Sequence, residues 1–327
     1  MFATLLGALP MPPLPKGTRR GSPEAADAAV EVAIRAQEDA GLEPLTDGRL
    51  GDRDPDRFVD WAAGTAVGSW RLAAALTQRA VKQALPGPYT LGRRPVSAPE
   101  DGSDSGSGAA RERERRTLAF ADALRAEVDA LAAAGCPLVE IEESQAHHVG
   151  TDEFERRLFR EAHHLLVDGV AGTHLSLSIV GGAAHDAGLE TILDAPYASL
   201  AVDLIAGPDN WHLVTPLAGD RGVIVGAESS RSVDEPKEVL LWAAHYAAST
   251  RGRGPARVGI GSAGSWANLT WDAAVRKMRL LGEAARLAAM PPSAELAREL
   301  DPRSLDARRA ALGHGTPASR SRRQGED

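Results

Sequence analysis

The chain has 327 residues, with 37 Lys and Arg against 45 Asp and Glu, so its formal net charge is −8. This acidic balance argues against nucleic acid and against an anionic membrane as partners, because both bind basic faces. The single cysteine excludes an internal disulfide and a metal site built from several thiolates. No apolar run approaches the ~20 residues that span a bilayer, and no basic segment precedes the apolar N-terminus. We therefore expect a cytoplasmic protein whose partner is a small molecule.

Eight short apolar segments alternate with helical ones along the chain. The helical pattern covers 22–41, 54–80, 118–134, 152–167, 234–249 and 269–289, and Ser22 followed by Pro23 is a good helix start. The strand candidates are 3–9, 42–48, 81–85, 138–141, 172–180, 198–205, 222–227 and 257–261. Eight strand candidates that alternate with helices predict an α/β fold, a (β/α)8 TIM barrel. The rival is an open doubly wound sheet, but no Gly-x-Gly-x-x-Gly turn follows the first strand and no phosphate loop occurs.

Composition divides the chain into a folded body and two polar segments. We predict that residues 1–290 form one barrel with a disordered insertion at 95–112, which is rich in Ser, Gly and Asp. Residues 291–327 form a C-terminal extension, which we expect to be disordered from about residue 313.

Three acidic residues crowd the end of the fourth strand candidate. Glu140, Glu142 and Glu143 accompany a short apolar run, although an unpaired carboxylate is costly to bury. In a barrel the carboxyl ends of the strands and the loops after them form the active-site face. The acids therefore indicate a site. The alternative is that one or two of them pair with a neighbouring Arg or cap the next segment, and that Glu140 points away.

Several stretches together resemble the cobalamin-independent methionine synthase family. Val81-Lys-Gln-Ala-Leu-Pro-Gly-Pro-Tyr-Thr-Leu91 is similar to its Leu-Pro-Gly-Pro-Tyr-Thr strand, and Ala133-Ala-Gly-Cys-Pro-Leu-Val-Glu-Ile-Glu-Glu143 to the strand ending Ile-Asp-Glu-Pro. Thr173-His-Leu-Ser-Leu-Ser178 resembles its His-x-Cys-Tyr-Ser segment, Thr46-Asp-Gly-Arg49 a Thr-Asp-Gly-Glu turn, and 258–278 the last strand and helix. These matches run in the family's order, to about residue 289. They imply a barrel that is also related to uroporphyrinogen decarboxylase.

The resemblance implies methyl transfer from a folate to a thiolate bound to zinc, which needs a His, two Cys and a Glu as ligands. Only His174 is kept here. Ser176 stands at the first Cys position, Ser262 or Ala263 at the second, and the Glu expected near 206–208 is absent. One imidazole with hydroxyls is a poor zinc site, so we expect no bound zinc. A folate remains the methyl donor that the resemblance implies.

The resemblance also supplies candidate site residues. Glu142 and Glu143 stand where the family holds the amino group of its substrate, whereas Arg49 replaces a glutamate and reverses a charge. We expect Glu142, Glu143, His174 and Glu228 to be catalytic, and Asp47, Arg49, Ser176 and Trp266 to bind substrate.

Three functions follow from this set. The first is a zinc-independent methyltransferase or related transferase for a small amino-acid-like or acidic substrate. The second is a cofactor-free decarboxylase or lyase, in which cationic side chains stabilise developing charge. The third is a binding paralogue without catalysis.

Overall fold

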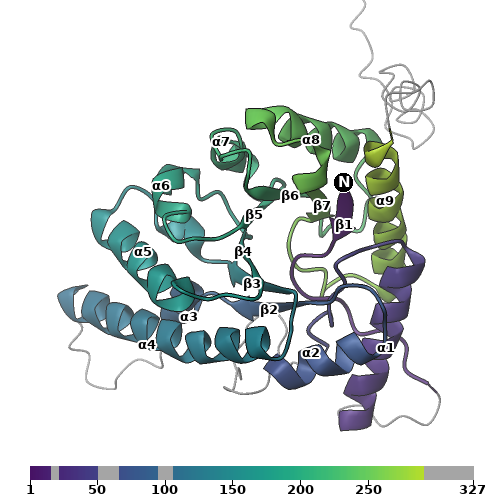
Figure 1. Ribbon diagram of the computed structural model, residues 1–327, viewed down its shortest axis with the longest axis horizontal. Coiled ribbons are helices and arrows are strands. Elements are labelled where there is room, and N and C mark those ends of the chain that lie inside the picture. Colours follow the sequence, from purple (N-terminus) through teal and green to yellow (C-terminus); the bar gives the residue numbers. More distant parts are fainter. Residues whose placement is uncertain (16–21, 51–65, 95–105, 291–327) are drawn as a thin grey trace, which may run out of the picture.

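A curled sheet of seven parallel strands forms the centre of the molecule (Figure 1). The computed structural model describes residues 1–15, 22–50, 66–94 and 106–290. Within them the strands are β1 (Phe2–Thr4), β2 (Lys82–Pro86), β3 (Leu138–Glu143), β4 (His174–Ile179), β5 (Ser199–Asp203), β6 (Gly222–Glu228) and β7 (Val258–Ser262). Their spatial order is β1-β7-β6-β5-β4-β3-β2, so each of β3 to β7 neighbours the strands before or after it in sequence. This is the order that successive strand–helix units produce.

Helices cover the outer face of this sheet (Figure 1). They are α1 (Pro23–Asp39), α2 (Ala66–Ala75), α3 (Pro88–Gly92), α4 (Gly106–Ala133), α5 (Glu153–Val167), α6 (Leu189–Ile192), α7 (Trp211–Val214), α8 (Lys237–Ser249) and α9 (Trp271–Ala289). Side-chain caps fix three of the starts. Ser22 accepts a hydrogen bond from Ala25 N, Asp152 from Phe154 N, and Thr270 from Ala273 N. None of the helices in the described residues is long and apolar enough to cross a membrane.

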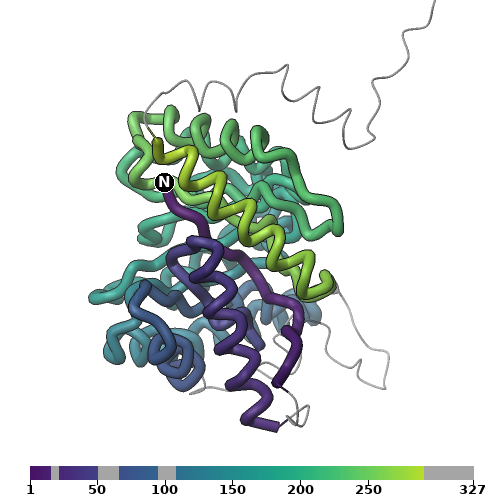
Figure 2. The backbone as a smooth tube through the Cα atoms, turned by 90° about the vertical axis from the view of Figure 1, so that its right-hand side faces the viewer, coloured from purple at the N-terminus to yellow at the C-terminus, as the bar shows by residue number. Residues whose placement is uncertain are grey.

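The first and last long helices lie side by side, as Figures 1 and 2 show from two directions. Gly282 of α9 permits this approach, because a Cβ placed there would lie 1.7 Å from the carbonyl oxygen of Ala40, just after α1. Glycine is unfavourable inside a helix, so its presence here is explained by the packing and not by helix propensity.

One of the eight predicted strands, 42–48, is not a regular strand. Residues 43–45 lie between the two edges of the sheet: Glu43 N donates to Ala3 O, Leu45 N to Ala80 O, and Lys82 N to Leu45 O. The segment contains one isolated bridge, Leu45 to Val81, and Pro44 in it has no N–H to donate. The prediction of eight barrel strands is therefore corrected to a curled parallel sheet of seven.

The two faces of the strands differ in chemistry. Outward residues such as Val139 and Ile141 of β3 belong to the large apolar core against the helices. Inward residues are mostly polar or small, as Glu140, Glu142 and Ser178 illustrate. A separate small apolar cluster of Leu6, Val180, Ala201 and Ile224, with Phe2 packed against it, crosses the inside of the sheet. The sheet interior therefore has a polar region on each side of an apolar layer.

Part of the predicted disordered insertion is ordered. Residues 106–112 form the start of α4, and Arg113 on this helix pairs with Glu155 of α5. Residues 95–105 of that prediction lie outside the described residues, as does the whole extension 291–327 and the 54–65 part of the second predicted helix.

Candidate functional site

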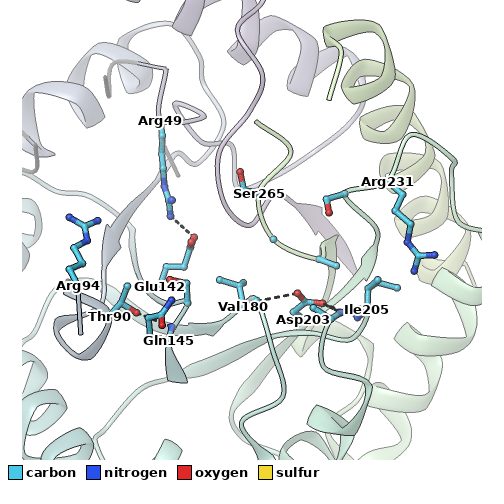
Figure 3. Close-up of a pocket in the computed structure, with 16 residues that line it drawn as sticks. Arg49, Thr90, Arg94, Glu142, Gln145, Val180, Asp203, Ile205, Arg231 and Ser265 are labelled. Carbon is cyan, nitrogen blue, oxygen red and sulfur yellow. Dashed lines mark hydrogen bonds and ion pairs between the residues drawn. The ribbon is translucent and has the colours of Figure 1, made fainter. Parts of the chain in front are cut away.

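A cavity of about 1030 Å³ opens where the carboxyl ends of the strands meet. The loops after β3, β4, β5, β6 and β7 all contribute to its wall, together with the turn at Arg49 and helix α3. Its charged lining residues are Arg49, Arg94, Glu142, Asp203 and Arg231, and several of them are drawn in Figure 3. A cavity at this edge of a parallel α/β sheet is the usual position of a ligand site.

Arg49 reaches into the cavity from a tightly held turn and pairs with Glu142 on β3 (Figure 3). The turn is anchored by Gln37 of α1, whose amide bonds to both the N and the O of Thr46 at 2.9 and 2.8 Å. Asp47 Oδ1 then accepts from Arg49 N at 3.0 Å, which supports a left-handed backbone (φ 55°) at Arg49. A non-glycine residue in this region is uncommon and is kept only where its surroundings hold it. Arg49 is thus preorganised, with its Nη2 donating to Glu142 Oε2.

Asp203 forms the opposite wall at the end of β5. Its Oδ1 accepts from Ile205 N and Ala206 N, both at 2.8 Å, and its Oδ2 accepts from Gly181 N at 3.2 Å (Figure 3). Burial raises the pKa of this carboxyl, and the three backbone donors oppose that rise. A fixed carboxyl group with a raised pKa in a cavity is suited to exchanging protons with a ligand.

The spacing of these two carboxylates follows from the sheet. Glu142 pairs in register with Ser178 of β4, and Ser178 with Ala201 of β5, so Asp203 lies two residues further toward the open end. Strands lie about 4.8 Å apart, which separates the two backbones by roughly 10 Å across the sheet and about 7 Å along it. The space between Glu142 and Asp203 is therefore wide enough for a small molecule.

Glu143, the other predicted acid of β3, does not line the cavity. Successive strand residues point to opposite faces, so it faces the helices. Its carboxylate accepts from Tyr89 N at 3.0 Å, from Thr90 N at 2.7 Å and from the Thr90 hydroxyl, and it lies 3.2 Å from His163 Nε2. The prediction that Glu143 shares the mouth with Glu142 is wrong: Glu143 caps the start of α3.

Glu228 also faces away from the cavity. A β-bulge between Gly226 and Glu228 shifts the alternation, and the side chain pairs with Lys277 of α9 in a fully buried contact. Burial raises the pKa of Glu228 to about 7, although the charge and hydrogen bond of Lys277 oppose that rise. This predicted catalytic residue instead joins the sheet to the helix layer, while Ser230 and Arg231 after it reach the cavity.

His174 and Ser176 lie at the other end of the sheet. His174 is the first residue of β4, and its Nε2 is 2.9 Å from the Ser199 hydroxyl. Both residues line a second cavity at the amino ends of the strands. The prediction that they share a mouth with Glu142 is therefore wrong, because the His-Leu-Ser-Leu-Ser stretch is the strand itself and not its carboxyl end.

The remaining predicted residues support the site without lining its cavity. Trp266 is 1% exposed, with its backbone N donating to Ala8 O at 2.8 Å, so it packs in the core. Asp47 is buried beneath the Arg49 turn and positions it. Of the eight predicted site residues, only Glu142 and Arg49 line the cavity.

Sequence reasoning missed Asp203. It lies near the carboxyl end of the predicted strand 198–205, the same kind of position that singled out Glu142, and the strand-end rule alone would have found it. Thr90 of the short helix α3 was missed, as were Arg94 and Arg231 in the segments after α3 and β6, because these segments give no comparable signal.

Zinc does not fit this donor set. The described residues contain no group of three His, Cys, Asp or Glu side chains placed to hold a metal ion. Cys136 is buried beside the amino end of β3, where burial raises the pKa of its thiol to about 11. The described residues that line the cavity include carboxylates, hydroxyls, an amide and arginines but no His or Cys, so they offer no nitrogen or sulfur ligand of the kind that zinc prefers.

Two solved structures with a similar fold are described as B12-independent methionine synthases, one of them as putative. The chain resembles a B12-independent methionine synthase from Shewanella sp. W3-18-1, described in complex with selenomethionine, with a TM-score of 0.71 and 16% identity over 87% of this chain and 96% of that one. It also resembles a putative vitamin-B12 independent methionine synthase from Listeria monocytogenes, with a TM-score of 0.62 and 14% identity over 88% and 97%. No family model and no curated protein matches the chain. The resemblance seen in the sequence is thereby confirmed at the level of fold: the chain has the fold of the B12-independent methionine synthase-like proteins.

Proposed function

We propose that the chain is a methyltransferase-like enzyme that acts, without zinc, on a small amino-acid-like or acidic substrate. The observation that carries this is one cavity at the carboxyl ends of the strands that holds both signs of charge: Glu142 and Asp203 on its walls, and Arg49 held against Glu142. We read residues 43–45 as the reduced second strand of a (β/α)8 barrel, which places this cavity at the barrel's active-site face.

Each charged group has a role in this proposal. A substrate ammonium group lies between Glu142 and Asp203 and donates a hydrogen bond to each carboxylate. A substrate carboxylate lies toward Arg49, whose guanidinium is fixed by its turn. Asp203, whose pKa is raised by burial, exchanges a proton with the reacting group.

The proposed methyl group and its donor rest on the likeness to methionine synthases in sequence and fold. The Shewanella protein is described with selenomethionine, an amino acid of the kind that this cavity suits by charge and volume. A folate is the donor that the sequence resemblance implies. Methionine is therefore the first ligand to test.

The binding test uses calorimetric titration of the purified protein with L-methionine and with homocysteine. Glu142→Gln and Arg49→Gln should each weaken binding by ~10-fold or more, because each removes one charged contact in a confined pocket. Glu161→Gln on the exposed face of α5 is the matched control and should leave the affinity unchanged. Equal affinity in the parent and in both cavity variants would show that the ligand binds elsewhere.

One observation favours the decarboxylase or lyase alternative. Three arginines, Arg49, Arg94 and Arg231, line the cavity against two carboxylates, a balance that suits a substrate with more than one acidic group. Titration with a dicarboxylate such as succinate separates the two functions, since tighter binding of succinate than of methionine supports this alternative. Tight binding of either ligand without turnover would support the non-catalytic paralogue.

A further inference from the structure

A second cavity, of about 670 Å³, opens at the amino ends of the strands, opposite the candidate active site. The apolar layer of Leu6, Val180, Ala201 and Ile224 crosses the sheet interior between them: Val180 lines the first cavity and Ile224 lines the second. We call this second cavity the amino-end chamber. Because the two cavities share no lining residue, a ligand in the chamber does not occupy the candidate active site.

One row of inward residues forms the polar wall of the chamber. Glu140 of β3, Ser176 of β4 and Ser199 of β5 are register partners on neighbouring strands, and Gly222 of β6 ends the row without a side chain. Adjacent strands lie about 4.8 Å apart, so these side chains stand close enough to contact one small polar group together. His174, one step nearer the opening, donates to or accepts from Ser199 across 2.9 Å.

Two of these side chains have polar atoms with no hydrogen-bond partner among the described residues. Glu140 is 1% exposed: its Oε2 bonds to Lys82 Nζ at 2.8 Å, whereas its Oε1 has no partner. Ser176 is 0% exposed, and its hydroxyl also has none. Unsatisfied buried polar atoms cost free energy, and most such groups in proteins are paired. A change of χ1 is enough to redirect the Ser176 hydroxyl toward the chamber.

The deep part of the chamber has no net charge. Lys82 and Glu140 neutralise one another, and burial lowers the pKa of His174, which keeps its imidazole neutral at pH 7. Phe2, Leu138 and Ile224 add apolar walls. Glu43, Asp220 and Arg257 also line the chamber, but they are exposed and stay hydrated on its solvent side. A charged ligand in the deep part would lose its hydration and meet only Lys82 and Glu140, which already pair with one another.

We propose that the amino-end chamber is a second binding site, for an uncharged small molecule with one amide or hydroxyl group and a compact apolar body. The polar group bonds to Glu140 and Ser176, and the apolar body packs on Phe2, Leu138 and Ile224. The alternative is that ordered water alone satisfies the two polar atoms, with the Lys82–Glu140 pair serving only to hold the strands together.

The test compares three probes of similar size with the full-length protein: benzamide, benzoate and benzylammonium. We expect benzamide to bind at least about 5-fold more tightly than either charged probe in a calorimetric or NMR titration. A crystal soaked in benzamide should show its amide within hydrogen-bond distance of Ser176. Equal or tighter binding of a charged probe, or a chamber that holds water only, would overturn the proposal.

Two serines of one strand give a matched pair of variants. Ser176→Ala removes the chamber hydroxyl and should weaken benzamide binding by about 3- to 10-fold, the size of one neutral hydrogen bond. Ser178→Ala removes an equally buried hydroxyl that also has no partner among the described residues, but Ser178 does not line the chamber, so affinity should stay within 2-fold. Ser176→Val fills the chamber and should abolish binding while β4 keeps a residue suited to a strand. Equal effects of the two alanine variants would contradict the proposal.

Discussion

Four buried carboxylates stand near the carboxyl ends of the strands, and they divide into two pairs. Glu142 and Asp203 face inward, line the cavity and lie across it from one another. Glu143 and Glu228 face outward, where Glu143 caps α3 and Glu228 pairs with Lys277 of α9. The inner pair is arranged for a ligand, whereas the outer pair joins the sheet to its helices.

The difference shows that the face of the strand decides the role of an acid, and that its place in the sequence does not. Glu142 and Glu143 are adjacent residues with the same side chain, yet they lie on opposite sides of β3. The inner face meets the cavity of about 1030 Å³, while the outer face meets packed helices. Substitutions should therefore affect binding at the inner pair and stability at the outer pair.

The largest effect is expected at Glu143. Glu143→Ala leaves two backbone N–H groups at the start of α3 and the Thr90 hydroxyl without their buried acceptor. Losing a buried charged partner of this kind costs about 3–5 kcal/mol of unfolding free energy. Urea unfolding, followed by circular dichroism, measures it.

Asp152→Ala is a useful reference for that measurement, since it removes a partly exposed cap that accepts from Phe154 N at 2.8 Å. A cap of this type is worth about 1 kcal/mol. If Glu143→Ala lowered the unfolding free energy no more than Asp152→Ala does, Glu143 would not have the structural role that we assign to the outer pair.

Glu228, one of the outer pair, should make the unfolding free energy depend measurably on pH. Burial raises its pKa to about 7 in the folded protein, from the ordinary value of 4.5, so the folded state binds its proton more tightly than the unfolded state does. The stability that this proton contributes is present at low pH and is lost as the pH rises from about 4.5 to 7. The shift corresponds to about 3 kcal/mol over that window.

The comparison with Glu228→Gln isolates this contribution from other titrating groups. Unfolding free energies of the parent and the variant are measured between pH 4.5 and 7.5. The unfolding free energy of the parent, measured relative to that of the variant, should fall as the pH rises. A difference that stays constant, or that grows with pH, would mean that Glu228 titrates as an ordinary carboxyl group.

Much of the fold was predictable because it follows from local patterns. The apolar strand segments and the helix caps at Ser22 and Thr270 are short-range signals, and seven of the eight predicted strands form. The segment at 42–48 failed as a strand because Pro44 lacks a donor, so that hydrogen bonding is limited to a few contacts.

The site was predictable only in part, because the side of the sheet to which a side chain points depends on the strand register. Glu142 and Arg49 line the cavity, but Glu228 does not, since the β-bulge that turns it outward leaves no mark in the sequence. His174 was misplaced because a motif match shows which residues correspond but does not show where a strand begins. Such features depend on long-range pairing, which one sequence does not reveal.

The smallest effect on stability is expected at Glu142. In Glu142→Gln the amide oxygen can still accept the hydrogen bond from Arg49 Nη2, and the adjoining cavity admits water to both groups. The unfolding free energy should therefore change by no more than about 1 kcal/mol, although the same variant weakens ligand binding. The measurement is the urea unfolding used for Glu143→Ala, at the same pH. A loss of about 3 kcal/mol would place Glu142 with the outer carboxylates, and the division between a binding pair and a structural pair would fail.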